Sequence, residues 1–165
     1  MRGTPLLLQL LFLHYGLVPL LGLPDWLRDH AAVVSAVTGL ALNYGAYEAE
    51  IYRAGLLAIP VGQMEAALAL GLTRRQAIWH VVVPQAVHLV IPPVTNDFIN
   101  LFKDTAVCSV IAVEELSKRY NISVNNTPRA FLELALVTAA LYLAMSYPLA
   151  LLTRQLEKKT TAARA

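Results

Sequence analysis

The sequence predicts an all-α integral membrane protein, a helix bundle with about four spans and one polar, helix-rich loop. Hydrophobic residues make up 57% of the 165 positions and charged residues only 15%, and the mean hydropathy is +0.54. Soluble domains carry many more charges than this. Uncharged runs recur along the chain, with no internal repeat and no long linker between them. These features indicate one membrane domain.

The first span is expected in the uncharged run from Pro5 to Pro24, because about twenty helical residues cross the ~30 Å of a hydrocarbon core. His14 within it has no evident partner in the sequence. A secretory signal is the alternative, since Arg2 precedes a leucine-rich run, but no Ala-x-Ala cleavage site follows.

The second span is expected from Ala31 to Tyr47, after a short charged connection over 25–30. The charged residues Glu48, Glu50 and Arg53 follow directly, and a charged side chain facing lipid is energetically costly. We therefore expect this helix to continue past the membrane edge. Glu50 and Arg53 lie three residues apart, so they share a helix face and are expected to pair.

A polar stretch over residues 60–84 interrupts the membrane pattern. Pro60 fits the first turn of a helix, and Gly71 can adopt the left-handed conformation that ends one. These residues predict a short helix over 63–70. Its many alanines make it thin, so that another surface could approach closely.

A second helix is predicted from Arg74 toward Val83. Thr73 can cap its first turn, and Gln76 can bond back to Thr73 as in a capping box. A helix, a glycine turn and a second helix with Arg74 and Arg75 also describe a DNA-binding helix-turn-helix. DNA binders are usually strongly basic, whereas the net charge here is +2.

The third span contains prolines at 84, 92 and 93, and residues before proline disfavour helix. We therefore expect the span to begin near Pro93. Beyond it, five polar residues fall within a roughly 120° arc of a helix at 100° per residue. This polar stripe consists of Asn96, Asp97, Asn100, Lys103 and Asp104.

A polar stripe in a membrane helix usually faces the bundle interior or a water-filled cavity. It is therefore a candidate lining for a pathway or a subunit interface. The alternative is that Lys103 and a nearby carboxylate neutralise each other in packing.

The last span is expected from Leu134 to Thr153, with a kink at Pro148, after a solvated connection over 114–129. The basic end of the chain is expected to fray, with residues 160–165 as a disordered tail.

Four crossings place both ends and the 60–84 loop on one side of the membrane. That side carries eight basic residues and the other side four, which predicts a cytoplasmic loop. The eight are Arg2, Arg53, Arg74, Arg75, Arg154, Lys158, Lys159 and Arg164; the four are Arg28, Lys118, Arg119 and Arg129.

The loop carries Glu65-Ala66-Ala67, then Gly71, then Val81-x-Val83-Pro84. This pattern resembles the EAA loop of ABC-importer permeases, whose usual form ends Ile-x-Leu-Pro. Other segments resemble the polar amino acid (histidine/glutamine-type) branch of that family. They are residues 47–55 with 59–63, Arg2-Gly3-Thr4-Pro5 and Phe102-Lys103-Asp104-Thr105, so the resemblance covers nearly the whole chain.

The resemblance implies a multi-pass permease of the bacterial inner membrane that imports polar amino acids. The loop would form a coupling helix that docks on an ATP-hydrolysing subunit. The loop residues concerned are Glu65, Ala66, Ala67, Gly71, Arg74, Arg75 and Pro84. Further implied partners are the second copy of that ATPase, a second permease subunit, identical or related, and an extracytoplasmic amino acid-binding protein.

Permeases of that family typically have five spans, with the Arg-Gly-Thr-Pro element after the first. Here the element starts at residue 2. We therefore expect residues 1–159 to form the permease domain without its first helix. A misassigned or truncated start is the favoured explanation, and a natural short form is the alternative.

No phosphate loop, paired carboxylates, Ser/His/Asp set or histidine cluster is evident, and there is a single cysteine, Cys108. We expect no catalysis, cofactor, metal or nucleic acid partner. An ion-coupled carrier or channel and a membrane-tethered DNA-binding regulator are the alternative functions. A carrier would be expected to show broken helices in corresponding halves.

Overall fold

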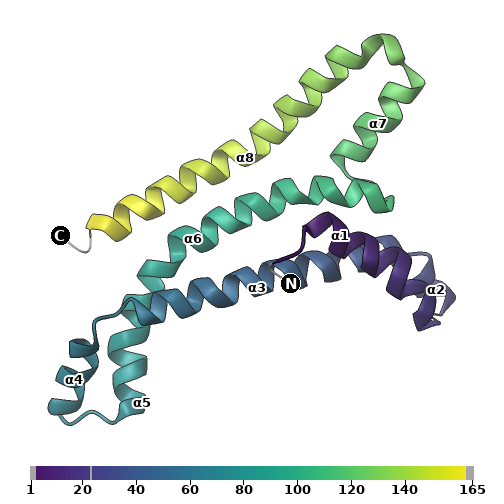
Figure 1. Ribbon diagram of the computed structural model, residues 1–165. Helices are drawn as coiled ribbons and strands as arrows, with labels where there is room; N and C mark the ends of the chain where they lie inside the picture. The colour runs from purple at the N-terminus through teal and green to yellow at the C-terminus, as the bar shows by residue number, and fades with distance from the viewer. Residues whose placement is uncertain (1–2, 23, 163–165) are drawn as a thin grey trace. The chain divides into compact units, whose positions relative to one another are not determined.

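The computed structural model describes the backbone of residues 3–22 and 24–162, and side chains as far as Gln155. The described part of the chain is helical and contains no strand (Figure 1), which confirms the predicted all-α class. Arg2 and Arg164, both counted in the charge asymmetry, lie outside the described residues. So do the side chains of Lys158 and Lys159, and residues 163–165 of the expected tail.

The described elements, in chain order, are α-helices joined by short π and 3₁₀ segments, labelled η. They are α1 (Leu6–Leu11), η1 (Phe12–Leu17), η2 (Val18–Leu21), α2 (Asp25–Arg28), α3 (Ala31–Leu57), α4 (Val61–Ala69), α5 (Arg74–Ala77), η3 (Ile78–Val82), α6 (Val83–Asp104), η4 (Thr105–Ile111), α7 (Leu116–Asn126), η5 (Pro128–Ala130) and α8 (Phe131–Ala162).

Two continuous helices within the described residues are long and apolar enough to cross a membrane. They are Arg74–Ile111, which joins α5, η3, α6 and η4, and Pro128–Gln155, which joins η5 to most of α8. Helix α3 has 27 residues but is not one of these two helices. The apolar helix Leu6–Leu21 is shorter, about 24 Å at 1.5 Å per residue.

The expectation that the third span begins near Pro93 is wrong. Helix α6 runs unbroken over Val83–Asp104 with Pro92 and Pro93 inside it. Each proline removes one backbone donor, but a non-helical segment in hydrocarbon would leave many more backbone groups unpaired. The helix therefore continues through both prolines.

The connection over 114–129 is more ordered than expected, because most of it is helix α7. Glu115 caps this helix, and its carboxylate accepts hydrogen bonds from the backbone N–H groups of Ser117 at 2.8 Å and Lys118 at 2.6 Å. A side chain that satisfies free N–H groups of a first turn stabilises a helix start. The sequence did not predict this helix, because the stretch contains several asparagines, which have low helix propensity.

The contacts divide the chain into two compact units, which are described separately. Unit 1 is Met1–Ala46 with Ile99–Leu149, and unit 2 is Tyr47–Phe98 with Ala150–Ala165. The core of unit 1 is a small cluster of Leu10, Ala36, Cys108 and Ile111, all buried. It lies where α1 packs against η4.

Within unit 1 the first helical segment pairs antiparallel with α3. The amide of Asn43 donates to Gln9 Oε1 at 3.2 Å, and His14 Nδ1 lies 3.2 Å from Ser35 Oγ. His14 thus has the partner that the sequence did not reveal. Between these contacts, Gly39 lies directly beneath Leu10. Small residues that allow close backbone approach are typical of helix pairs in membranes.

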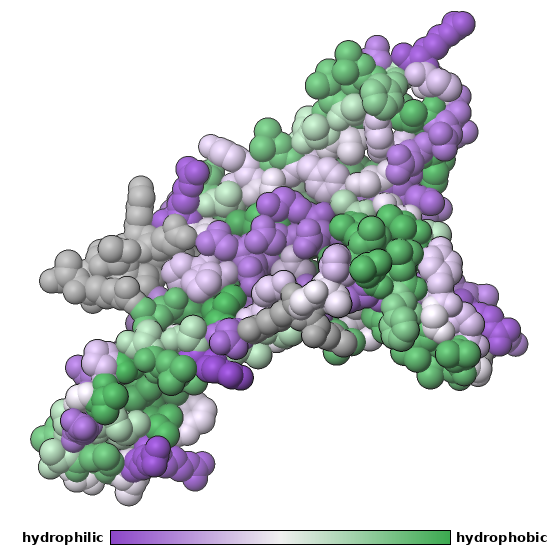
Figure 2. Space-filling model, in the orientation of Figure 1, coloured by the Kyte–Doolittle hydropathy of each residue, from purple (hydrophilic) through white to green (hydrophobic). Residues whose placement is uncertain are grey.

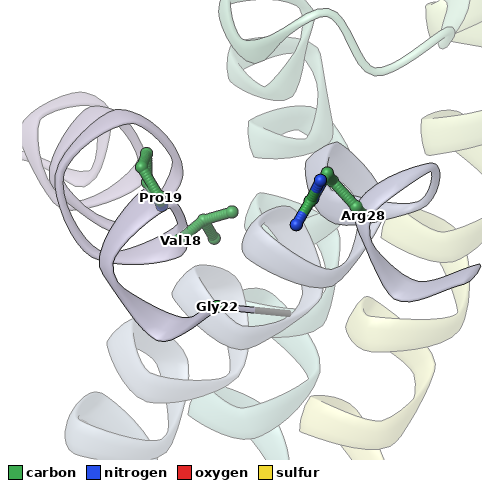
Figure 3. Close-up of a pocket in the computed structure, with 4 residues that line it drawn as sticks. All are labelled: Val18, Pro19, Gly22 and Arg28. Atoms are coloured by element: carbon green, nitrogen blue, oxygen red, sulfur yellow. The ribbon is translucent and has the colours of Figure 1, made fainter. Parts of the chain in front are cut away.

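A pocket of about 350 Å³ opens in the same unit and is lined by Val18, Pro19, Gly22 and Arg28 (Figure 3). Gly22 has a positive φ of 56° and ends the first helical segment. The pocket contains none of the predicted site residues.

In unit 2, α3 approaches α6 closely at Gly55. A Cβ at this position would lie 2.7 Å from Val90 Cγ1. The predicted pair of Glu50 and Arg53 is confirmed, with Oε2 and Nε 3.9 Å apart.

The contact at Gly39 predicts a difference between two glycine substitutions in α3. A Cβ at Gly39 would lie 2.6 Å from Leu10 Cδ2, whereas a Cβ at Gly45 would meet nothing within 4 Å. Because Leu10 is fully buried, Gly39→Ala should be about 1–3 kcal/mol less stable than Gly45→Ala, the usual cost of overpacking. Thermal unfolding of the two variants in detergent measures the difference. Equal midpoints would contradict the close contact.

Candidate functional site

The predicted loop over 60–84 forms a compact helical hairpin, α4 followed by α5. The turn between them is closed at Gly71, which has a φ of +83°. Its N–H donates to Leu68 O at 2.9 Å, and the N–H of Leu72 donates to Ala67 O at 3.2 Å. This pair of bonds is a Schellman motif, in which a left-handed residue satisfies the last carbonyls of a helix. The prediction that Gly71 ends the first helix in the left-handed conformation is confirmed.

The second helix begins with the predicted capping box. The backbone N–H of Gln76 donates to Thr73 Oγ1 at 3.4 Å, and the N–H of Thr73 donates to Gln76 Oε1 at 2.9 Å. Both ends of the turn are therefore held by local hydrogen bonds. Only four residues, 70 to 73, connect α4 to α5, so the hairpin has little freedom at its tip.

The hairpin is packed through alanines. Ala67 is 3% exposed and Ala77 is fully buried, and α4 packs against both α5 and η3. Gln85 Nε2 adds a bond to Gln63 Oε1 at 3.4 Å. Ala67 therefore lies inside the hairpin and lets the helices approach, and it is not available to another protein.

The outer surface of the hairpin carries both charge and apolar area (Figure 2, lower left). Five of the predicted site residues are exposed here, namely Glu65, Ala66, Gly71, Arg74 and Arg75. Leu70 at the tip is 85% exposed and Trp79 on η3 is 62% exposed. Among the described residues no cation forms an ion pair with Glu65. Pro84 is exposed in the first turn of α6.

The polar stripe lies on α6 as the spacing predicted, since this helix is continuous over all five positions. Asn96, Asn100 and Lys103 are exposed, and the two carboxylates are half-buried. Asp104 accepts a hydrogen bond of 2.8 Å from the hydroxyl of Tyr44. Neither carboxylate of the stripe, nor any other described one, forms an ion pair with Lys103, so the structure does not show the internal neutralisation considered above.

Tyr44 and Gln85 were missed by sequence reasoning. Tyr44 is 60 residues from Asp104 along the chain, and a tyrosine in an apolar run carries no local signal of such a bond. Trp79 could have been found, because a large aromatic residue four positions after Arg75 shares its helix face.

The described residues offer no group of three or more His, Cys, Asp or Glu side chains that could hold a metal ion. The site consists of an exposed hairpin, α4 and α5, and a polar face on α6. Helix α6 continues the helix that begins with α5.

The chain belongs to the family described as "Binding-protein-dependent transport system inner membrane component", whose model matches residues 1–162. It is 37% identical to the L-cystine transport system permease protein TcyB of Bacillus subtilis (strain 168), over 96% of this chain and 65% of that one. It is 36% identical to the glutamine transport system permease protein GlnP of Escherichia coli (strain K12), over 96% of this chain and 70% of that one.

Among solved structures, the chain is similar to the "Crystal structure of an amino acid ABC transporter with histidines". The TM-score is 0.83 at 36% identity, over 96% of this chain and 71% of that one. This membership confirms the predicted family and fits neither a carrier nor a DNA-binding regulator. The chain spans about 60–65% of the length of the first four curated relatives.

The turn at Gly71 predicts opposite tolerance of two substitutions. A valine at φ +83° is strained by about 1–2 kcal/mol, whereas asparagine adopts left-handed backbone more readily. Gly71→Val should therefore speed amide hydrogen exchange over 61–77 by about tenfold, and Gly71→Asn should change it little. Equal exchange in both variants would show that the left-handed turn does not hold the hairpin.

Proposed function

We propose that this chain is the permease subunit of an ABC importer for polar amino acids, and that an ATP-hydrolysing subunit docks on the α4–α5 hairpin. The observation that carries the proposal is the hairpin itself. Its tip is fixed by the Gly71 turn and the Thr73 capping box, and it exposes Glu65, Ala66 and Leu70. A docking element must keep its shape under load, and local hydrogen bonds at both ends of the turn provide that.

Charge and apolar area together favour a protein partner for this surface. An exposed carboxylate at Glu65 suits a cationic side chain, and a leucine that is 85% exposed suits an apolar groove. Both lie on one short helix and its tip. The ATPase would therefore bind the outer face of α4, while Ala67 and Ala77 pack α4 against α5 and η3.

The helical backbone continues from Arg74 to Ile111 without a break. In the proposed cycle, closure of two ATPase subunits moves the hairpin, and the connected helix carries that movement into the membrane. ATP is hydrolysed on the partner, and this chain contributes no catalytic group. The excess of basic residues on the loop side, eight against four, supports a cytoplasmic hairpin and C-terminus in the bacterial inner membrane.

The polar stripe on α6 is proposed to line the translocation pathway or the interface with a second permease subunit. Three of its five side chains are exposed, and an exposed ammonium such as that of Lys103 is costly against lipid. Water or a facing subunit would remove that cost. A second permease, identical or related, is therefore part of the proposal, with residues 1–159 as the membrane domain.

The substrate class is inferred from the relatives. Their names specify cystine and glutamine, both polar amino acids, and the solved relative is an amino acid transporter. An extracytoplasmic binding protein would deliver the amino acid, as the family description implies.

Cross-linking tests the docking surface with a matched pair of positions. In a Cys108→Ser background, Ala66→Cys should cross-link to the ATPase subunit through a short bifunctional reagent, because position 66 is exposed. The neighbouring Ala67→Cys should not, because position 67 is 3% exposed. The measurement is the yield of the cross-linked pair in native membranes.

Uptake of radiolabelled amino acids in a strain lacking the gene tests the proposed transport activity. We expect uptake of one polar amino acid to be lost and to be restored by the gene. Cross-linking absent at both positions, or uptake unchanged for every polar amino acid, would overturn the proposal.

A further inference from the structure

Helix α8 contacts the rest of unit 1 along one narrow line of residues. Its half-buried positions recur at intervals of four and include Thr138, Tyr142 and Ser146, whereas the large apolar residues around them are exposed. The hydroxyls of Thr138 and Ser146 donate to carbonyls of α8 itself, at 2.8 and 2.7 Å. Of these three hydroxyls, that of Tyr142 is the one that bonds another described element.

The hydroxyl of Tyr142 meets the start of α7. It donates to Glu115 Oε2 at 3.0 Å and lies 2.9 Å from Ser117 Oγ. A phenol has a single proton, so when that proton goes to Glu115 the Ser117 hydroxyl must donate to the tyrosine oxygen. The result is a short chain of hydrogen bonds, in which Ser117 donates to Tyr142 and Tyr142 donates to Glu115.

Glu115 is held in place independently of Tyr142. Its two carboxylate oxygens accept the backbone N–H groups of Ser117 and Lys118. The acceptor is therefore already oriented when the tyrosine hydroxyl reaches it. Hydrogen bonds to an ionised acceptor are stronger than neutral ones, and lipid supplies no hydrophobic force to press helices together. The Tyr142 hydroxyl therefore joins α8 to the start of α7 by hydrogen bonds, and the rings of Tyr120 and Phe131, 6.2 Å apart, make a second contact between the two helices.

The ring of Tyr142 contacts a third element. It lies edge-on to Phe102 of α6, with ring centroids 6.4 Å apart, within the range of favourable aromatic pairs. Phe102 directly precedes Lys103 and Asp104 of the polar stripe. Tyr142 therefore joins α6, α7 and α8 at the carboxyl end of the stripe.

We infer that Tyr142 is a positioning residue for transport: its hydroxyl locks the start of α7 to α8, and its ring holds the end of α6 that carries Lys103 and Asp104. The inference rests on the proposed function, because its consequence is read as uptake. Removal of the hydroxyl should loosen the three-helix contact and slow translocation. Substrate delivery, which the binding protein performs, should be unaffected.

The test uses Tyr142→Phe in the whole importer, with its ATPase subunits and binding protein, reconstituted in lipid vesicles. We expect the maximal uptake rate to fall about fivefold, with the apparent KM within twofold and the amount of assembled protein unchanged. Tyr147→Phe is the matched control, because Tyr147 is on the same helix and 56% exposed; it should leave both quantities unchanged. Ser117→Ala removes one partner of the Tyr142 hydroxyl but keeps its hydrogen bond to Glu115, so it should lower the uptake rate less than Tyr142→Phe does.

Two further measurements separate positioning from general damage. Combining Tyr142→Phe with Glu115→Gln should lower uptake no more than Glu115→Gln alone, because residues that act through one contact are not additive. Amide hydrogen exchange over 116–126 should increase in Tyr142→Phe and not in Tyr147→Phe.

The exchange measurement does not depend on transport, so the two failures can be distinguished. If the unmodified protein imports no amino acid, the proposed function fails, and exchange still decides whether Tyr142 fixes α7. The positioning role is overturned if amide exchange over 116–126 is unchanged in Tyr142→Phe, if uptake by Tyr142→Phe stays within twofold of the unmodified protein, or if Tyr147→Phe loses as much activity as Tyr142→Phe.

Discussion

The turn at Gly71 is the constraint on which the shape of the α4–α5 hairpin depends, and with it the proposed docking of an ATPase subunit. A left-handed residue closes α4, and a reciprocal pair of hydrogen bonds at Thr73 and Gln76 opens α5 two residues later. Because both helix ends are satisfied locally, the hairpin needs no large core, and two alanines are enough to pack it. A small hairpin held in this way can transmit a displacement instead of absorbing it, as the proposed coupling to an ATPase subunit would require.

Elsewhere the helices are held by close approach and by single polar contacts. Gly39 lies beneath Leu10 in unit 1, and Gly55 lies beneath Val90 in unit 2. Tyr44 bonds Asp104, and Tyr142 bonds Glu115. In lipid, where apolar surface gains little from burial against another helix, such contacts account for much of the specificity of packing. They also leave large apolar areas exposed on α8, as expected for a surface that faces lipid or another subunit.

Local signals in the sequence were sufficient for the hairpin, since Gly71, Thr73 and Gln76 each act within a few residues. The stripe on α6 also followed from spacing alone. The prolines misled the reasoning, because the preference of a residue before proline is weaker than the need to pair backbone groups in a membrane helix. Helix α7 was missed because its asparagines are poor helix formers and its start is fixed by a cap. Contacts such as Tyr44 with Asp104 join residues 60 apart, and no local pattern encodes them.

The side of the membrane on which the hairpin lies tests the account most directly. With Cys108 replaced by serine, a cysteine at Glu65 can be labelled by a membrane-impermeant maleimide, with a cysteine at Asn125, exposed on α7, as the comparison. The account predicts that position 65 reacts only in inside-out vesicles and position 125 only in intact spheroplasts. Labelling of position 65 from outside intact spheroplasts would contradict it, because no cytoplasmic ATPase could then reach the hairpin.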